Sequence, residues 1–175
     1  MTLDELNHVN AADFVAALGG IFEHSPWVAE AVLPARPFID LSALHRAMCQ
    51  AVQDAPAERQ LALIRAHPQL ASKAAVAGEL TAASQSEQSG AGLLHCSAEE
   101  YARLRQFNDD YQQRFGFPFI LAVRGHDRSS ILAELARRLQ CDPASERATA
   151  LTQIERIAAF RLADLLGQPL ASPSN

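Results

Sequence analysis

SAEEYARLRQFNDDYQQRFGFPFILAV, residues 97–123, is the part of this chain that most clearly predicts its fold class. Ser97 and Glu100 have the spacing of a capping box, which predicts that a helix begins here. Aromatic residues and leucine then recur at roughly helical spacing up to Gly116, a residue typical of helix ends. The continuous apolar run 117–123, which contains a proline, predicts a short, buried, extended segment. Together these features indicate a long helix followed by one extended strip inside a core.

Helix start and stop signals recur on both sides of this stretch. Capping residues and prolines stand where helices begin, and glycine or proline follows where they end. One helix has to stop near His67, because a residue before a proline is pushed out of the α region. On inward faces we expect Leu61, Ile64 and Leu139. We expect helices at about residues 11–18, 26–33, 40–53, 56–66, 98–115, 128–139 and 143–167, with Ser25 capping the second, and the alanine-rich stretch 71–83 also favours helix.

The composition supports an all-α fold. Alanine and leucine number 33 and 22, whereas valine and isoleucine number seven each. Alanine and leucine favour helices, while β-branched residues favour strands. A chain of 175 residues has the length of one domain. We therefore expect a single domain, 1–175, built as a helical bundle of roughly seven to nine helices with one short extended apolar segment.

Charge and cysteine usage exclude several classes of protein. The net charge is −5, so the basic footprint typical of nucleic-acid binding is missing. No apolar run approaches the length of a membrane span, about 18 residues, and the N-terminal residues carry no secretory signal. The cysteines are widely spaced, and His45 with Cys49 gives only two of the ligands that zinc needs. We expect a cytoplasmic protein with no metal, no nucleic-acid partner and no membrane.

Two polar features interrupt the helical pattern. His67 continues an apolar helix face and lies at the boundary that Pro68 imposes. It suits proton transfer near neutral pH, but it also fits a hydrogen-bonded core histidine at a helix end. The polar cluster 84–88 suits a polar ligand, with Glu87 orienting a base, but it also fits an exposed helix end before Gly90.

Two further places combine polar groups with apolar surroundings. The strip 117–123 leaves backbone groups that need partners, and either an amide-rich ligand or other parts of the chain can supply them. Arg161 occupies a slot in the apolar stripe of the last helix. There it either snorkels to solvent, our first expectation, or meets a buried anion.

Taken in order, these places form a set of motifs that spans nearly the whole chain. The motifs are SPWV at 25–28, RPF at 36–38, AHPQL at 66–70, SQSEQ at 84–88, AGL at 91–93, FNDDYQQRFGFPFI at 107–120, VRG at 123–125 and ERIAAFRL at 155–162. From about Phe14 to Leu166 the chain resembles the 2-oxo-4-hydroxy-4-carboxy-5-ureidoimidazoline (OHCU) decarboxylases of purine catabolism. Gln69 and Arg114 depart from the usual residues of that family, and both lie beside the expected site residues.

The resemblance implies an all-α enzyme that forms (S)-allantoin from OHCU without a cofactor. It implies His67 as the catalytic residue and Glu87 as its orienting partner. It also suggests a homodimer. The substrate contacts that it implies are Pro68, Ser84, Gln85, Ser86, Gln88, Phe119, Ile120, Leu121, Ala122, Val123 and Arg161.

Two other functions remain open from the residues alone. An alanine- and leucine-rich bundle is also a common scaffold, so the chain can be a non-catalytic helical interaction domain. It can also be a lyase or hydrolase that acts on another ureido or hydantoin compound. The enzyme hypothesis requires the site residues to line one concavity, and the scaffold hypothesis does not.

Overall fold

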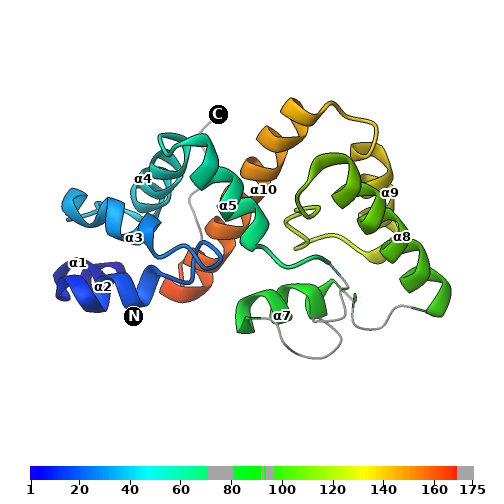
Figure 1. Ribbon diagram of the computed structural model, residues 1–175. Helices are drawn as coiled ribbons and strands as arrows, with labels where there is room; N and C mark the ends of the chain where they lie inside the picture. Colours follow the sequence, from blue (N-terminus) through cyan, green and yellow to red (C-terminus); the bar gives the residue numbers. More distant parts are fainter. Residues whose placement is uncertain (71–80, 92, 94–96, 169–175) are drawn as a thin grey trace, which may run out of the picture. The chain divides into compact units, whose positions relative to one another are not determined.

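The computed structural model describes residues 1–70, 81–91, 93 and 97–168, and these residues form helices and connecting segments (Figure 1). The described residues contain nine α-helices, one 3-10 helix and no strand, so the all-α prediction is confirmed. Residues 71–80 of the expected alanine-rich helix lie outside the described part. The helices are α1 (Leu3–His8), α2 (Ala11–Leu18), α3 (Trp27–Val32), η1 (Leu33–Ala35), α4 (Leu41–Gln53), α5 (Ala57–Ala66), α7 (Ala82–Gly90), α8 (Ala98–Phe115), α9 (Arg128–Arg138) and α10 (Pro143–Leu166).

The chain divides into two compact units. The first comprises Met1–Leu63 with Glu155–Asn175, and the second comprises Ile64–Ile154. The first half of α10 belongs to the second unit, and its second half belongs to the first unit. None of the helices in the described ranges is both long enough and apolar enough to cross a membrane.

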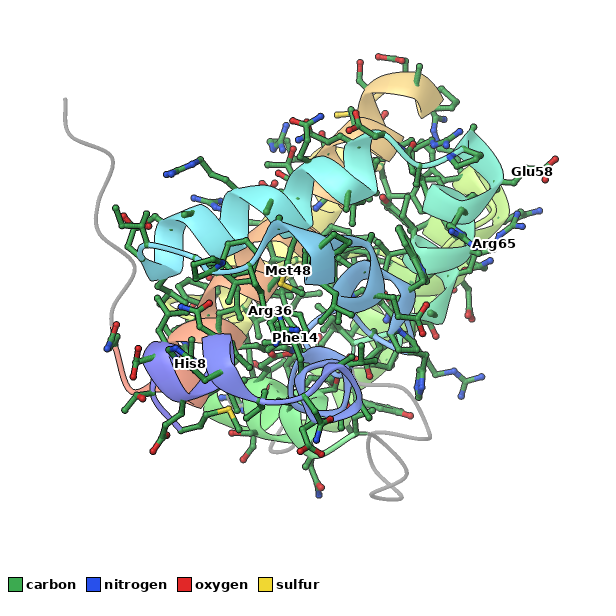
Figure 2. All side chains as sticks on the ribbon, turned by 90° about the vertical axis from the view of Figure 1, so that its left-hand side faces the viewer. His8, Phe14, Arg36, Met48, Glu58 and Arg65 are labelled. Atoms are coloured by element: carbon green, nitrogen blue, oxygen red, sulfur yellow. The ribbon has the colours of Figure 1, made fainter. Side chains whose placement is uncertain are left out.

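The first unit is built around the apolar faces of α1 to α4. Phe14 and Met48 are fully buried in its core. The guanidinium of Arg36 lies 4.7 Å from the centre of the Phe14 ring, and its Nη1 donates a hydrogen bond of 2.7 Å to the Val9 carbonyl (Figure 2). This arginine therefore links the segment after η1 to the segment between α1 and α2.

The predicted cap of α3 is wrong. Pro26 occupies the N-cap position with helical backbone angles, and no side chain caps the helix. The Ser25 carbonyl already accepts a hydrogen bond of 3.2 Å from the Val28 N–H. Because this tight turn already satisfies the Val28 N–H, which a Ser25 cap would bind, the Ser25 hydroxyl is not needed there.

The second unit contains the predicted long helix and strip. Ser97 and Glu100 form the predicted capping box, and Gly116 ends α8 in the left-handed region with φ of 75°. Residues 117–123 then run through the core without helical structure, and all seven are buried. The expected buried, non-helical apolar segment is therefore present.

Two inward positions differ from the prediction. Leu63 is buried in place of Leu61, which is half-buried, and Arg138 is buried in place of Leu139. A fully buried arginine is unusual, because its charge loses hydration unless it is paired. Arg138 therefore requires a partner inside the second unit.

Candidate active site

His67 lies directly after the last residue of α5. His67 is 6% exposed, and its backbone N–H donates a hydrogen bond of 3.2 Å to the Ile64 carbonyl. The predicted helix boundary before Pro68 is confirmed, since α5 ends at Ala66. His67 is therefore buried, although it lies in the non-helical segment that follows α5.

Two hydrogen bonds tie the His67 segment to α8 and to the residue that follows it. Before the histidine, Arg65 Nε donates to the Gly116 carbonyl at 3.0 Å. After it, Asn108 Nδ2 donates to the Leu70 carbonyl at 2.8 Å, and Asn108 is itself 3% exposed. The two bonds join residues that are separated in sequence by 51 and 38 positions. They therefore fix the His67 segment within the second unit far better than local turns would.

Helix α7 divides the predicted polar cluster between two faces. Ser84 and Gln88, one turn apart, are each 2% exposed. Gln85 and Ser86 are exposed, and Glu87 is half-buried. The cluster therefore combines a buried polar face with an exposed face near the end of α7 at Gly90.

The strip takes hydrogen bonds from side chains of other helices. Arg138 Nη1 donates to the Ile120 carbonyl at 2.6 Å, and Gln153 Oε1 accepts from the Ala122 N–H at 3.0 Å. The Val123 carbonyl accepts from the His126 N–H at 2.9 Å. Other parts of the chain thus supply hydrogen-bond partners for some of the backbone groups of the strip, whose partners the sequence left undecided.

Arg138 belongs to a buried cluster that the sequence analysis missed. Arg138 and Glu146 are both 0% exposed, and Arg138 Nε donates to Glu146 Oε1 at 2.6 Å. The Tyr111 hydroxyl donates to the same oxygen. The Arg138 guanidinium also lies 4.6 Å from the centre of the Phe119 ring. Burial and the bond to Glu146 raise the pKa of Tyr111 well above its usual range.

A signal for this cluster was present in the sequence. Arg138 follows Ile131 and Leu135 at spacings of seven and three residues, so it continues their buried face. Arg161 was singled out by the same kind of spacing. Glu146 lies eight residues after Arg138 across a short turn, and only the structure shows that they meet.

Arg161 is buried and paired in the first unit. It is 7% exposed, and its Nη1 lies 2.7 Å from Glu23 Oε2 and 3.3 Å from the Gly20 carbonyl. Glu23 is 2% exposed. Snorkelling, our first expectation, is therefore wrong, and the buried anion of the second interpretation is the chain's own carboxylate.

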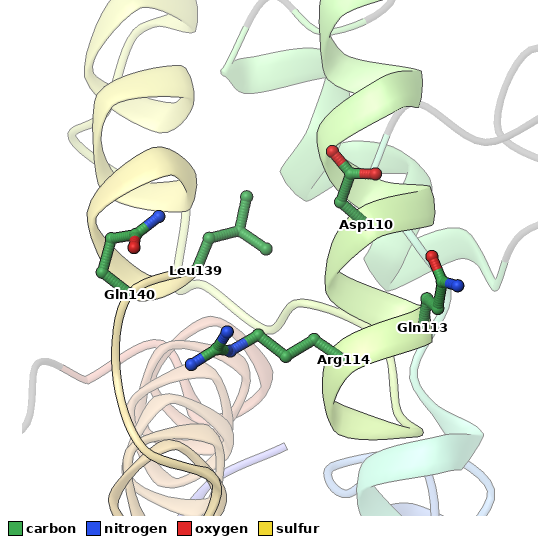
Figure 3. Close-up of a pocket in the computed structure, with 5 residues that line it drawn as sticks. All are labelled: Asp110, Gln113, Arg114, Leu139 and Gln140. Carbon is green, nitrogen blue, oxygen red and sulfur yellow. The ribbon is translucent and has the colours of Figure 1, made fainter.

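A groove in the second unit lies apart from the predicted residues. It has a volume of about 360 Å³ and lies between α8 and α9 (Figure 3). Its lining includes Arg114, whose Nη2 donates to the Cys141 carbonyl at 3.2 Å. The described residues contain no group of three histidine, cysteine, aspartate or glutamate side chains arranged to hold a metal.

Comparisons with known proteins assign this arrangement to a family. The family model described as OHCU decarboxylase matches residues 7–163. This chain belongs to the OHCU decarboxylase family. The matched region contains His67, Glu87 and Arg161, and the family resemblance seen in the sequence is confirmed.

Individual relatives support the family assignment. The chain is 43% identical to the 2-oxo-4-hydroxy-4-carboxy-5-ureidoimidazoline decarboxylase of Mus musculus over 95% of this chain and 94% of the relative. It is 42% identical to the protein of the same name from Haloferax volcanii over 94% of this chain and 95% of the relative. The crystal structure of an (S)-allantoin synthase is 31% identical, with a TM-score of 0.78 over 95% of this chain. This OHCU decarboxylase family chain spans about half, 54%, of that solved chain.

Proposed function

We propose that this chain decarboxylates OHCU and releases (S)-allantoin in urate degradation. The observation that carries the proposal is the family match across residues 7–163, which includes His67 at its buried helix boundary. The names of the relatives provide the substrate class and the handedness of the product.

The substrate itself can accept the electrons of the breaking bond. Its carboxylate is one carbon away from a ring C=N bond, so the electron pair left by CO2 can move to that nitrogen. The protein then has to hold the breaking C–C bond perpendicular to the ring plane. It also has to stabilise the negative charge that spreads over the ring.

His67 is our candidate for proton handling. A proton must reach one face of the ureido-bearing carbon, and this choice of face sets the S configuration. We propose that His67 handles the proton at that carbon or at the hydroxyl, and that Glu87 orients the ring. A carboxylate beside an imidazole favours its protonated form, which suits a proton donor. Removing such a donor typically lowers the rate about a hundred- to ten-thousand-fold.

The substrate contacts are proposed on three segments. Pro68 follows His67, and Ser84 and Gln88 provide the buried polar face of α7. The strip 119–123 provides backbone groups and an apolar wall. We further propose that Arg161, oriented by Glu23, binds the carboxylate or the developing charge of the substrate, because a guanidinium can bind an anion with two parallel hydrogen bonds.

The experiment is a chiral assay with purified protein. OHCU is generated in place by urate oxidase and hydroxyisourate hydrolase, and the circular dichroism of allantoin is followed. We expect rapid formation of the S product, its loss in His67→Ala, and normal rates in His45→Ala. His45 is a suitable control because it is half-buried and its ring bonds to the Glu155 carbonyl at 2.8 Å in the first unit. A slow racemic product, equal to that without protein, would discard the proposal.

We also propose that residues 1–175 act as one catalytic domain and pair as a homodimer. The family resemblance supports both statements. Light scattering coupled to gel filtration tests the second, and a mass near 19.0 kDa in place of twice that value would reject it.

A further inference from the structure

The strip 119–123 is fixed along one edge by two side chains from different helices. Arg138 of α9 binds the Ile120 carbonyl, and Gln153 of α10 binds the Ala122 N–H. The two bonded groups belong to residues two positions apart. In an extended chain, backbone groups of such residues point to the same edge.

The opposite edge of the strip has a different set of backbone groups. Backbone directions alternate along an extended chain, so in that conformation the N–H and C=O groups of Phe119 and Leu121 would point away from Arg138 and Gln153. A ureido or hydantoin compound offers alternating N–H and C=O groups that complement such an edge. The direction in which Leu121 presents its peptide groups thus depends on the side chains that bind its neighbours.

We propose that Arg138 and Gln153 are positioning residues for substrate binding, acting through the backbone of the strip. The inference rests on the proposed function, because it requires the strip to contact the substrate. Neither side chain needs to touch the substrate. Each sets the rotation of the strip about its own axis, and hence the direction of the Leu121 peptide groups.

The surroundings of Arg138 suit this role. The guanidinium is held at three sides by the Glu146 carboxylate, the Ile120 carbonyl and the face of the Phe119 ring. Tyr111 donates a further hydrogen bond to Glu146. All of these residues are buried: Arg138, Glu146 and Tyr111 are 0% exposed, Phe119 is 1% exposed and Ile120 is 3% exposed. A buried polar cluster joined by several hydrogen bonds has few alternative geometries, so it holds the strip in one orientation.

The test compares Gln153→Met with Gln153→Glu in the chiral assay, over graded OHCU concentrations. Methionine has a similar length but gives no oxygen to the Ala122 N–H, whereas glutamate keeps an acceptor there. We expect KM to rise about tenfold in Gln153→Met, as for loss of one hydrogen bond, with kcat within about twofold of the parent value. We expect Gln153→Glu to restore KM to within about threefold.

A matched control separates positioning from stability. Gln60 is half-buried in the first unit, and its Nε2 donates to the carbonyls of Val52 and Gln53. We expect Gln60→Met to lower Tm as much as Gln153→Met does, with KM unchanged. If Gln153→Met lowers Tm and leaves KM unchanged, the positioning role is overturned.

A second variant tests Arg138 without leaving a buried charge. The triple variant Arg138→Met, Glu146→Leu and Tyr111→Phe replaces the whole polar cluster with apolar groups, an exchange that buried ion pairs often tolerate. We expect it to fold and to raise KM at least tenfold, and a folded variant with the parent KM would contradict the inference. A parent protein that forms no excess of S product would instead contradict the proposed function.

Discussion

Replacing Glu23 by glutamine tests whether the buried pair with Arg161 is an internal requirement of the first unit. Glutamine keeps the size and the oxygen of the side chain but removes its charge. Arg161, which is 7% exposed, then loses the negative charge of Glu23 beside its guanidinium. Breaking a buried ion pair from one side typically costs about 3–5 kcal/mol, because a charge is left uncompensated.

The expected loss is large enough to measure in a simple thermal scan. For a chain of this size, each kcal/mol lowers Tm by about 2–4 °C, so Glu23→Gln should melt about 6–20 °C below the parent. The double variant Glu23→Leu with Arg161→Met removes both charges. It should recover most of the stability, because an apolar pair of similar volume replaces an ion pair at little cost.

A neighbouring side chain provides the control. His24 Nε2 lies 4.0 Å from the other oxygen of Glu23, but its side chain is 69% exposed. His24 has a positive φ of 48°, which asparagine tolerates. We therefore expect His24→Asn to change stability by less than about 1 kcal/mol. If the free energy of unfolding of Glu23→Gln lies within about 0.5 kcal/mol of the parent value, the ion pair does not stabilise the protein as argued and the reasoning is refuted.

Three further perturbations test other features. Burial, with a smaller contribution from Glu155, raises the pKa of Cys49 to about 12. At pH 8 the thiolate fraction of Cys49 is therefore about a thousandfold below that of an ordinary thiol. Peptide mass spectrometry should show iodoacetamide labelling of the half-buried Cys141 well before that of Cys49, and equal labelling rates would contradict this. Asn108→Ala removes the hydrogen bond to Leu70 and should lower kcat/KM in the chiral assay at least tenfold, and an unchanged value would show that the bond does not position His67. Hydrogen bonds from Ser130 lower the pKa of Asp127 in the folded protein. The stabilisation that the Asp127 carboxylate gives is therefore present above the unfolded pKa of about 3.9 and is lost as the pH falls through the folded pKa. The Tm difference between Asp127→Ala and the parent should thus shrink below pH 4, and a constant difference would contradict the role of Asp127 as a cap.

Local rules were sufficient for most of the helix boundaries. Asn10, Asp40 and Asp127 stand where cap-forming residues are expected, and each side chain accepts a hydrogen bond from the backbone N–H three residues later. The boundary before Pro68 was also predicted, because proline restricts its neighbour whatever surrounds it. Ser25 was misjudged because a tight backbone turn satisfied the donor that its hydroxyl was expected to bind.

The partners of the polar core depend on contacts between distant residues. Arg161 was recognised as unusual from its place in an apolar stripe, but Glu23 lies 138 positions away and no local pattern connects them. The same holds for the strip, whose burial followed from its apolar run while its partners Arg138 and Gln153 come from separate helices. Local sequence thus predicts that a buried polar group needs a partner, and only tertiary structure supplies its identity.

The division of α10 between the two units has a consequence for synthesis on the ribosome. The first unit needs residues from both ends of the chain, so its first 63 residues emerge long before the segment from Glu155 onward. At a translation rate of about 5–20 residues per second, about 7–28 s pass between the incorporation of Glu23 and that of Arg161 into the nascent chain. During this interval the second unit, which is continuous in sequence, is made in full. The order of translation therefore favours the second unit as the first to fold, while the nascent N-terminal helices remain open to chaperones.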